Sequence, residues 1–328
     1  MRLLILSGSG VRDLLGYPEC AGVVRAALAA RARGEVHQPL RTIIQPDEAA
    51  GLMALMPAYW PGADPAYGLK AICVFPGNPA IGLDAHQGLV VLSSTRTGEP
   101  LAVLNASAIT EIRTAAASAV ATELLARDDA TELAIIGTGV QAGAHLLAIS
   151  ASRALTEVRV AGRDPAKAAA FAVRMQAEVR VPVTARPSAR EAVAGAGIIV
   201  TATSASEPVL RRGWLAPGTH VNAVGACLPR ARELDAATIA DAALFADSRE
   251  SVCSEAGDYL LALAEGAIGP GHIRAEIGEL LTGQAAGRTG DEEITVFESL
   301  GLAVADLAAA AYVYGEARRL SAGTWVDF

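Results

Sequence analysis

The chain has 328 residues, 52% hydrophobic and 19% charged, so it is long enough for two domains and too apolar for extensive disorder. Its formal net charge of -8 and isoelectric point near 5.2 argue against nucleic acid or an acidic membrane surface as a partner. Its four cysteines have neither a C-x-x-C pair nor metal-ligand spacing, which is typical of a reduced cytoplasmic protein. The apolar N-terminus reaches Gly8 and Asp13 too early to form a signal peptide.

Residues 1 to about 118 predict a mixed α/β domain. Helical periodicity over 22–33 is followed by predicted strands at 40–44 and 70–75. A hairpin is predicted from 89–93 and 101–105, because Gly98 and Pro100 lie in the turn between them. The Ala-rich segment 115–126 predicts a helix that leads into the next part of the chain.

From residue 132 onward the predicted strands and helices alternate, which favours a Rossmann-type, doubly wound parallel sheet. The segment 295–319 is rich in Ala and Leu and predicts one long helix that packs back on the first part. We therefore expect a Rossmann-type domain over 119–306 and a second α/β domain over 1–118 plus 307–328. The strands predicted in the parallel sheet are 133–136, 158–161, 197–203, 220–224 and 243–246.

The most specific local motif is a glycine-rich turn that directly follows the apolar strand 133–136. It has the pattern Gly137-x-Gly139-x-x-Ala142, which lets the backbone approach a pyrophosphate and points a helix N-terminus at its charge. The next predicted strand ends about 20 residues later, where such a unit binds the adenosine ribose. The motif predicts a bound dinucleotide, and it explains the uncharged run 133–152 better than a membrane span does.

Several segments, in order along nearly the whole chain, resemble the ornithine cyclodeaminase/mu-crystallin family. This resemblance implies a dinucleotide-binding domain and a second domain, built from both chain ends, that forms the substrate site and a homodimer. The matching segments are QPLRT (38–42), MPAY (56–59), GLK (68–70), HQG (86–88), TEIRTAAAS (110–118), the turn at 137–142, NAVGA (222–226) and TVFESLG (295–301).

Three cationic residues are the main candidates for the substrate site. Lys70 is one of only two lysines among 27 basic residues, and a lysine can exchange a proton when its pKa is lowered. The resemblance implies that Lys70 and Arg113 lie at the substrate and that Arg41 holds its carboxylate, for which a guanidinium fork is well suited. From the residues alone, Lys70 could instead be a solvated charge at a strand end.

Arg113 has a structural alternative of the same kind. It precedes the predicted Ala-rich helix, where it could pair with Glu111 or Asp128.

His86 lies in a family-like run and is a candidate for substrate contact, with a structural hydrogen bond as the alternative. The pocket walls are expected to come from loops, notably residues 53–60 and Ser299-Leu300, so that Leu300 contacts substrate.

The cofactor contacts are expected on the motif and on the family-like segments around it. No cluster of His, Cys, Asp or Glu has the spacing of a metal site, so no metal is expected. The predicted cofactor-binding residues are Thr114, Gly137, Gly139, Val140, Gln141, Arg163, Thr203, Asn222, Val224, Gly225 and Ser299.

The end of the second strand bears on the choice between NADH and NADPH. Gly162 occupies the position where an NAD-preferring relative places its acidic residue, and Arg163 follows it. Without a carboxylate for the ribose hydroxyl, a 2′-phosphate becomes acceptable, so NADPH is favoured over NADH. Asp164 is expected to cap the next helix, because Pro165 suits its first turn.

The chain departs from the family's cyclodeaminases after the strand 220–224. Those enzymes carry an aspartate there, in a Gly-Gly-Asp-x-Pro-Gly-Lys context, whereas this chain has Cys227 at that position and Ala231 in place of the lysine. A thiol with a pKa near 8.5 is a poor substitute for an ionised carboxylate as a base. No histidine is placed by a motif to activate Cys227 as a nucleophile.

The sequence therefore favours an NAD(P)H-dependent reductase of a ketimine that carries an α-carboxylate, such as pyrroline-2-carboxylate or piperideine-2-carboxylate. Lys70, Arg113 and Cys227 are the residues expected nearest the chemistry. One alternative is an ornithine or lysine cyclodeaminase, or an amino-acid dehydrogenase, that uses NAD. Another is a non-catalytic protein that binds a dinucleotide and a small acid.

Overall fold

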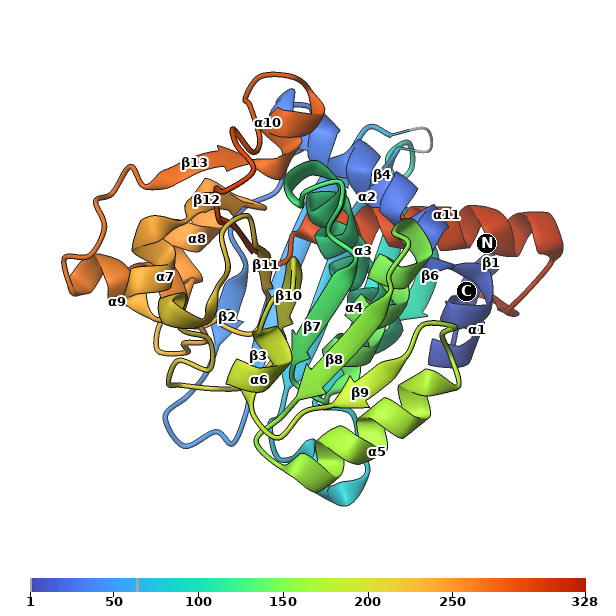
Figure 1. Cartoon of the computed structure of the whole chain (residues 1–328). Coiled ribbons are helices and arrows are strands. Elements are labelled where there is room, and N and C mark those ends of the chain that lie inside the picture. Colours follow the sequence, from blue (N-terminus) through green and yellow to red (C-terminus); the bar gives the residue numbers. More distant parts are fainter. Residues whose placement is uncertain (1, 63–64) are drawn as a thin grey trace. The chain divides into compact units, whose positions relative to one another are not determined.

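The computed structural model describes residues 2–62 and 65–328, and the chain divides into two compact units (Figure 1). Unit 1 comprises Met1–Arg113 and Gly301–Phe328, and unit 2 comprises Thr114–Leu300. The boundaries expected from the sequence, after residue 118 and before residue 307, lie within six residues of these divisions. The first division falls inside a single helix, α3 (Ala106–Leu125), which begins earlier than predicted.

Unit 1 is built on a seven-stranded mixed sheet with the order β15-β1-β6-β5-β4-β3-β2. Strands β1 and β6 are parallel, and the other neighbours are antiparallel. Its elements besides the start of α3 are β1 (Arg2–Leu6), α1 (Gly8–Leu14), α2 (Tyr17–Ala32), β2 (Thr42–Ile44), β3 (Leu52–Trp60), β4 (Ala66–Val74), the 3-10 helix η1 (Asn78–Ile81), β5 (His86–Ser94), β6 (Pro100–Asn105), α11 (Ala303–Leu320) and β15 (Thr324–Asp327).

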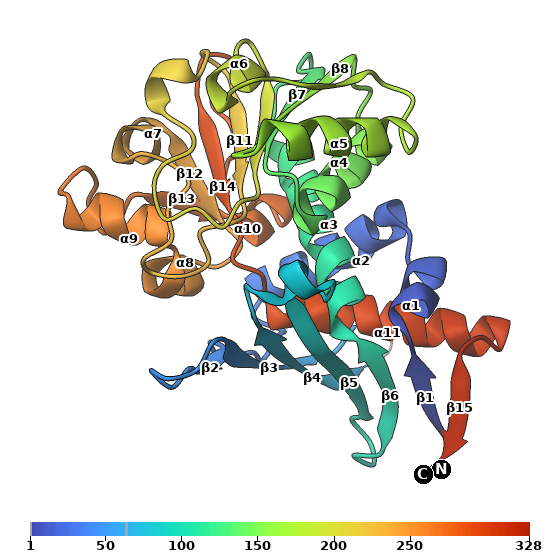
Figure 2. The same ribbon diagram turned by 90° about the horizontal axis from the view of Figure 1, so that it is seen from below.

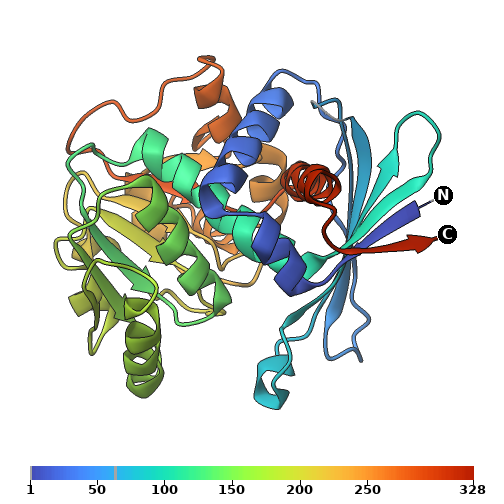
Figure 3. The same cartoon turned by 90° about the vertical axis from the view of Figure 1, so that its right-hand side faces the viewer.

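One face of this sheet is covered and the other is open. Residues on alternate positions of β4, such as Lys70 and Ile72, are buried on the side of α11, where Leu307 packs on Gly68. Helix α11 in turn packs against α2, as Figure 3 shows. The intervening positions of β4, such as Tyr67 and Leu69, are exposed on the opposite face.

Unit 2 is built on an eight-stranded sheet, parallel throughout, with the order β13-β12-β14-β11-β10-β7-β8-β9. Its elements besides the end of α3 are β7 (Glu132–Ile136), α4 (Val140–Ser152), β8 (Glu157–Ala161), α5 (Pro165–Gln176), β9 (Val183–Ala185), α6 (Ala189–Val193), β10 (Ile198–Thr201), the 3-10 helix η2 (Arg212–Trp214), β11 (His220–Ala223), α7 (Ala236–Asp241), β12 (Ala243–Ala246), α8 (Arg249–Glu255), α9 (Gly257–Ala264), β13 (Ile273–Glu276), α10 (Ile277–Leu281) and β14 (Thr295–Glu298).

The central strands of unit 2 are buried at nearly every position, because helices cover both faces of the sheet (Figure 2). On β7, Ala134 and Ile136 pack in the core with α6, α7, α8 and α9. Leu133 and Ile135 point the other way, into a second core with α4 and α5. The predicted doubly wound α/β fold is therefore confirmed.

Two elements differ from the prediction. Residues 295–319 do not form one helix, because the β-branched and aromatic residues 295–297 form β14 and Gly301, at φ +86°, separates this strand from α11. Residues 53–60 are not a loop but part of β3, which pairs along its length with β4. In the residues that the structure describes, no helix is long and apolar enough to cross a membrane.

Candidate functional site

The glycine-rich turn of unit 2 has the geometry that a pyrophosphate requires. Gly137 has φ +131°, and a Cβ atom there would lie 2.4 Å from the carbonyl oxygen of Ala202. Gly139 is the N-cap of α4, and no side chain caps this end of the helix. A Cβ atom added to Gly139 would meet no atom within 4 Å. The N–H groups of the first helical turn have no partner inside the helix, so this open space fits an anionic group.

The predicted cofactor residues come together at one edge of the parallel sheet. Strand β8 lies on one side of β7 and β10 lies on the other, so the strand order reverses at β7. The carboxyl ends of these strands therefore form a topological switch point. Most of the predicted residues follow the carboxyl ends of strands, where ligands of such sheets bind. They are Gly137, Gly139, Val140 and Gln141 after β7, Arg163 after β8, Thr203 after β10, Val224 and Gly225 after β11, and Ser299 after β14.

The end of β8 carries the features expected from the sequence. Gly162 lies against the turn, since a Cβ there would be 3.0 Å from Cγ2 of Thr138. Arg163 is exposed beside it. Asp164 caps α5 by accepting hydrogen bonds from the backbone N–H groups of Ala166 and Lys167, which confirms its predicted role.

Thr114 and Asn222 are the predicted cofactor residues that do not follow the carboxyl end of a strand, and both are buried. Thr114 lies on α3 and is 6% exposed, and Asn222 on β11 donates a hydrogen bond to Thr122 Oγ1 on α3. Further along, Ser118 Oγ contacts Nε2 of the buried His145 at 2.9 Å. Both polar contacts tie α3 to the interior of the unit, so Asn222 has a structural function whatever its part in cofactor binding.

In unit 1, two buried cations share one buried carboxylate. Lys70 Nζ lies 2.7 Å from Asp306 Oδ2, and Arg113 Nε lies 2.9 Å from Asp306 Oδ1. Lys70 points from β4 toward α11, and Asp306 is in the first turn of that helix. The pairing overturns two alternatives: Lys70 is not a solvated strand end, and Arg113 pairs with neither Glu111 nor Asp128. Arg113 also lies within α3 rather than before it.

Arg41 joins this group through the backbone of Gly301. It lies just before β2 rather than on a strand, and its Nη2 donates a hydrogen bond of 3.1 Å to the Gly301 carbonyl oxygen. A Cβ atom on Gly301 would lie 2.4 Å from Nη1 of Arg113. Gly301 is therefore held between two arginines, and any side chain there would displace a guanidinium. We call Arg41, Lys70, Arg113 and Asp306 the cation cluster.

The charges of the cation cluster favour an added anion. Burial lowers the pKa of Lys70 to about 7, and the positive charge of Arg113 acts in the same direction against the opposing carboxylate. Although burial opposes ionisation of Asp306, the charges of Arg113 and Lys70 hold its pKa below the usual value. The cluster thus combines an ionised carboxylate, two arginines and a lysine that can gain or lose a proton near neutrality.

His86 and Cys227 lie in different units. His86 begins β5 in unit 1, and partial loss of hydration, together with the charges of Lys70 and Arg113, lowers its pKa. Cys227 follows β11 in unit 2 and is half-buried, with Sγ 3.2 Å from the Val224 carbonyl oxygen. Leu300 is 4% exposed and packs in the core of unit 2. These placements leave their predicted contacts with substrate as predictions.

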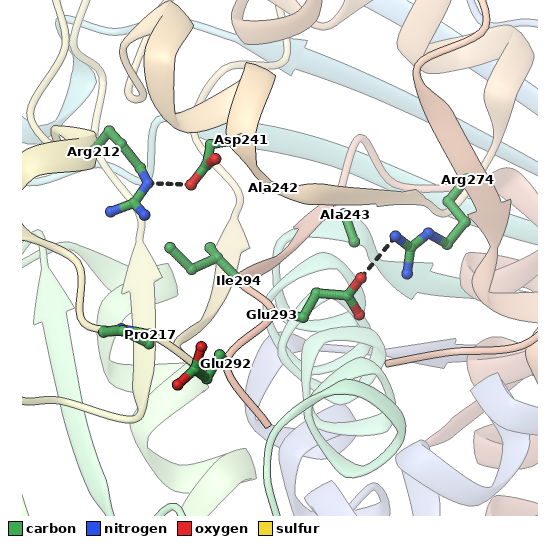
Figure 4. Close-up of a pocket in the computed structure, with 9 residues that line it drawn as sticks. All are labelled: Arg212, Pro217, Asp241, Ala242, Ala243, Arg274, Glu292, Glu293 and Ile294. Atoms are coloured by element: carbon green, nitrogen blue, oxygen red, sulfur yellow. Dashed lines mark hydrogen bonds and ion pairs between the residues drawn. The ribbon is translucent and has the colours of Figure 1, made fainter. Parts of the chain in front are cut away.

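A cavity of about 350 Å³ lies at the opposite edge of the unit 2 sheet (Figure 4). It is lined by residues that precede β11, β12 and β14, among them Pro217 and Ile294. Its two arginines are already occupied, since Arg212 pairs with Asp241 and Arg274 pairs with Glu293. This cavity therefore contains neither the glycine-rich turn nor any residue of the cation cluster.

The sequence analysis missed Asp306 and Glu233. Asp306 is the single acidic residue between positions 299 and 315, in a helix that otherwise buries apolar side chains, and this isolation was a usable signal. Glu233 is fully buried beside the loops that follow β10 and β11, and nothing in its sequence context indicates that burial. Among the described residues, no group of three or more His, Cys, Asp or Glu side chains could hold a metal ion.

Comparisons with known proteins cover the whole chain. It is 39% identical over 327 residues to a Δ1-pyrroline-2-carboxylate reductase of Bacillus cereus, with 99% of this chain and 100% of the relative covered. The Δ1-pyrroline-2-carboxylate reductase of Thermococcus litoralis, solved with NADH and L-proline, has a TM-score of 0.95 and 38% identity, covering 98% of this chain and 99% of that one.

An archaeal alanine dehydrogenase, solved as a dimer with bound NAD, has a TM-score of 0.93 and 34% identity over 100% of both chains. A sequence profile of the ornithine cyclodeaminase/mu-crystallin family matches residues 3–321. These matches span both units and include the glycine-rich turn and the cation cluster. The chain therefore belongs to the ornithine cyclodeaminase/mu-crystallin family.

Proposed function

We propose that this protein is an NAD(P)H-dependent reductase of a cyclic ketimine with an α-carboxylate, such as pyrroline-2-carboxylate or piperideine-2-carboxylate. The observation that carries the proposal is the cation cluster, in which Lys70 and Arg113 pair with one buried carboxylate and Lys70 titrates near neutrality. Arg41 joins them through the Gly301 carbonyl oxygen. The similarity to two pyrroline-2-carboxylate reductases supports the choice of substrate.

The cluster supplies the two things that such a substrate needs. The guanidinium groups of Arg41 and Arg113 bind and orient the carboxylate, because each presents paired N–H donors to its two oxygens. Lys70 holds a proton close to the imine nitrogen, and protonation makes the imine carbon more electrophilic. NAD(P)H, when bound at the turn of unit 2, supplies the hydride.

The first experiment is a direct comparison of two reactions. We expect rapid oxidation of NADPH or NADH, followed by nicotinamide absorbance, with either cyclic ketimine, and no ammonia from ornithine or lysine with NAD. Release of ammonia would contradict the proposal and favour a cyclodeaminase in which Cys227 replaces the family aspartate. Production of ammonia from alanine would favour an amino-acid dehydrogenase, to which the alanine dehydrogenase similarity points.

Arg113→Ala tests the anchoring role in the same assay. Loss of a charged hydrogen bond to the carboxylate removes roughly 1.5–3 kcal/mol of binding, so KM for the ketimine should rise at least about tenfold. The rate constant kcat should also fall, because the imine is no longer held in one orientation. Unchanged KM and kcat would exclude Arg113 from the substrate site.

Tight binding of a small acid without turnover by the wild type would favour the non-catalytic alternative.

NADPH is the proposed preferred cofactor. Gly162 leaves no carboxylate at the ribose position, and the exposed Arg163 is available for a 2′-phosphate. Arg163→Ala should weaken NADPH binding about tenfold, the equivalent of one charged contact, and leave NADH binding unchanged. Arg174→Ala, on the adjacent helix α5, is a matched control. An equal loss of both cofactors would contradict 2′-phosphate recognition by Arg163.

We also propose that the protein is a homodimer formed through the open face of the unit 1 sheet. Neighbouring strands present exposed apolar side chains on this face, including Ile5, Met53, Tyr67, Leu69 and Leu89. A contiguous apolar face of this extent is unusual on a monomer. The four free cysteines fit a reducing compartment, and we propose the cytoplasm.

Leu69→Arg tests this interface by light scattering on a size-exclusion column. A guanidinium at the centre of the face should convert the dimer to monomer, because an unpaired charge cannot be buried without a large penalty. Val173→Arg is the control, since Val173 is similarly apolar and 76% exposed on α5 of unit 2. A monomeric wild type, or a dimer that survives Leu69→Arg, would contradict the proposed interface.

A further inference from the structure

Glu233 is a fully buried carboxylate that accepts four hydrogen bonds, three from the loops after β10 and β11 and one from the last residue of β10. Its Oε1 accepts from the backbone N–H of Thr203 at 2.6 Å and from Thr203 Oγ1 at 2.7 Å, after β10. Its Oε2 accepts from the backbone N–H of Gly225 at 2.7 Å, after β11, and from Thr201 Oγ1 at 2.8 Å. One side chain therefore links the ends of two neighbouring strands.

The loops approach each other too closely for any residue with a side chain at position 225. A Cβ atom on Gly225 would lie 2.2 Å from the Thr203 carbonyl oxygen and 2.6 Å from Cδ of Glu233. The backbone of Glu233 is itself fixed from α9, because Asp258 Oδ1 accepts hydrogen bonds from the N–H groups of Glu233 and Leu234. Glu233 is thus held at its backbone and at both carboxylate oxygens.

We propose that Glu233 is a positioning residue that holds the loops after β10 and β11 in the geometry required to bind the dinucleotide. This inference rests on the proposed function, because it assumes that Thr203 and Gly225 border the cofactor. Glu233 acts through these loops and is not itself expected to contact substrate or cofactor. Its role differs from that of the glycine-rich turn, which lies after β7.

The substitution Glu233→Gln keeps the size of the side chain and removes one of its two hydrogen-bond acceptor oxygens. The amide has nearly the shape of the carboxylate, but its NH2 group replaces one of the two acceptor oxygens. In one orientation the NH2 faces the N–H of Thr203, and in the other it faces the N–H of Gly225. Threonine hydroxyls can rotate to accept a hydrogen bond, whereas a backbone N–H cannot. In either orientation one of the two loops therefore loses its backbone hydrogen bond to residue 233.

We expect Glu233→Gln to weaken binding of both NADH and NADPH at least tenfold, measured by titration of nicotinamide fluorescence. The KM for the ketimine at saturating cofactor should stay within twofold of wild type, which a general loss of structure would not produce. Hydrogen exchange at the amides of Thr203 or Gly225 should accelerate, while exchange in β7 should not change. Glu293→Gln, which removes a carboxylate at the opposite edge of the sheet, should leave dinucleotide binding unchanged.

Thr201→Val provides a milder test if Glu233→Gln does not fold. It removes one donor to Oε2 and leaves both backbone N–H contacts, so dinucleotide affinity should fall by a smaller factor, about threefold, in the same direction. Equal dinucleotide affinity in wild type, Glu233→Gln and Thr201→Val would overturn the inference. If the wild type itself binds neither NADH nor NADPH, the proposed function fails, and this outcome is distinct from the first.

Discussion

Unit 1 buries a lysine and an arginine against a single carboxylate, whereas unit 2 buries Glu233, Asp258 and Glu298 close to one another at the carboxyl ends of its strands. In unit 1 the carboxylate is ionised and positive charge is in excess, so the cluster favours an anion. In unit 2, burial and the charges of Asp258, Glu233 and Asp247 raise the pKa of Glu298 well above its usual value.

The difference shows two ways of keeping charge inside a protein. A buried ion pair is maintained by its opposite charge, and removal of one partner leaves the other uncompensated. A buried carboxyl group is maintained by hydrogen-bond donors, as at Glu233, or by taking up a proton, as at Glu298. The first arrangement suits recognition of a charged substrate, and the second suits the fixing of loops.

The largest effect is expected from Asp306→Asn in unit 1. The variant removes the carboxylate that pairs with both Lys70 and Arg113, and an uncompensated buried charge costs about 3–5 kcal/mol of unfolding free energy. Chemical denaturation should show the loss. Glu316→Gln, which breaks an exposed ion pair on the same helix, is the control and should have little effect. Equal effects of the two substitutions would mean that Asp306 does not compensate buried charge.

A smaller effect of opposite sign is expected from Asp258→Asn in unit 2. Both backbone hydrogen bonds go to Oδ1, which asparagine retains, and among the described residues Oδ2 has no hydrogen-bond partner. Burial raises the pKa of Asp258 to about 7, so the wild type loses stability as pH rises from about 4, the unfolded value, through 7.

Asp258→Asn has no such loss. Above the folded-state pKa of about 7, it should unfold with a free energy roughly 1–3 kcal/mol higher than wild type, and below pH of about 4 the two should converge. Denaturant titrations at several pH values check this. Destabilisation at every pH would show that the negative charge of Asp258 is itself required for stability.

The smallest expected effect is a pH dependence of anion binding at the cation cluster. Inhibition by pyrrole-2-carboxylate, whose ring nitrogen does not titrate near neutrality, should weaken as pH rises through about 7, because Lys70 loses its proton there. His86→Asn should leave this inflection in place, because the pKa of His86 is lowered from its usual value. An inflection that disappears in His86→Asn would assign the titration to His86 instead.

The parallel α/β unit and its glycine-rich turn could be predicted from the sequence alone. Their signals are local: apolar strands such as 133–136 are covered on both faces, and Gly137 must adopt a positive φ beside its own strand. The same holds for Asp164, which caps the helix that begins at the next residue. Each of these features depends on residues a few positions apart.

The pairing of the buried charges, in contrast, depends on contacts between elements far apart in the sequence. Asp306 contacts both Lys70 and Arg113, although it lies 193 residues after Arg113 in the sequence. The contact forms because α11 covers the sheet that contains β4. Glutamate is usually exposed, and the sequence around Glu233 gives no sign of its burial. Its backbone is held by Asp258 of α9 and its side chain by the loops after β10 and β11. Burial and pairing at such distances depend on the packing of whole elements, and no short stretch of sequence encodes them.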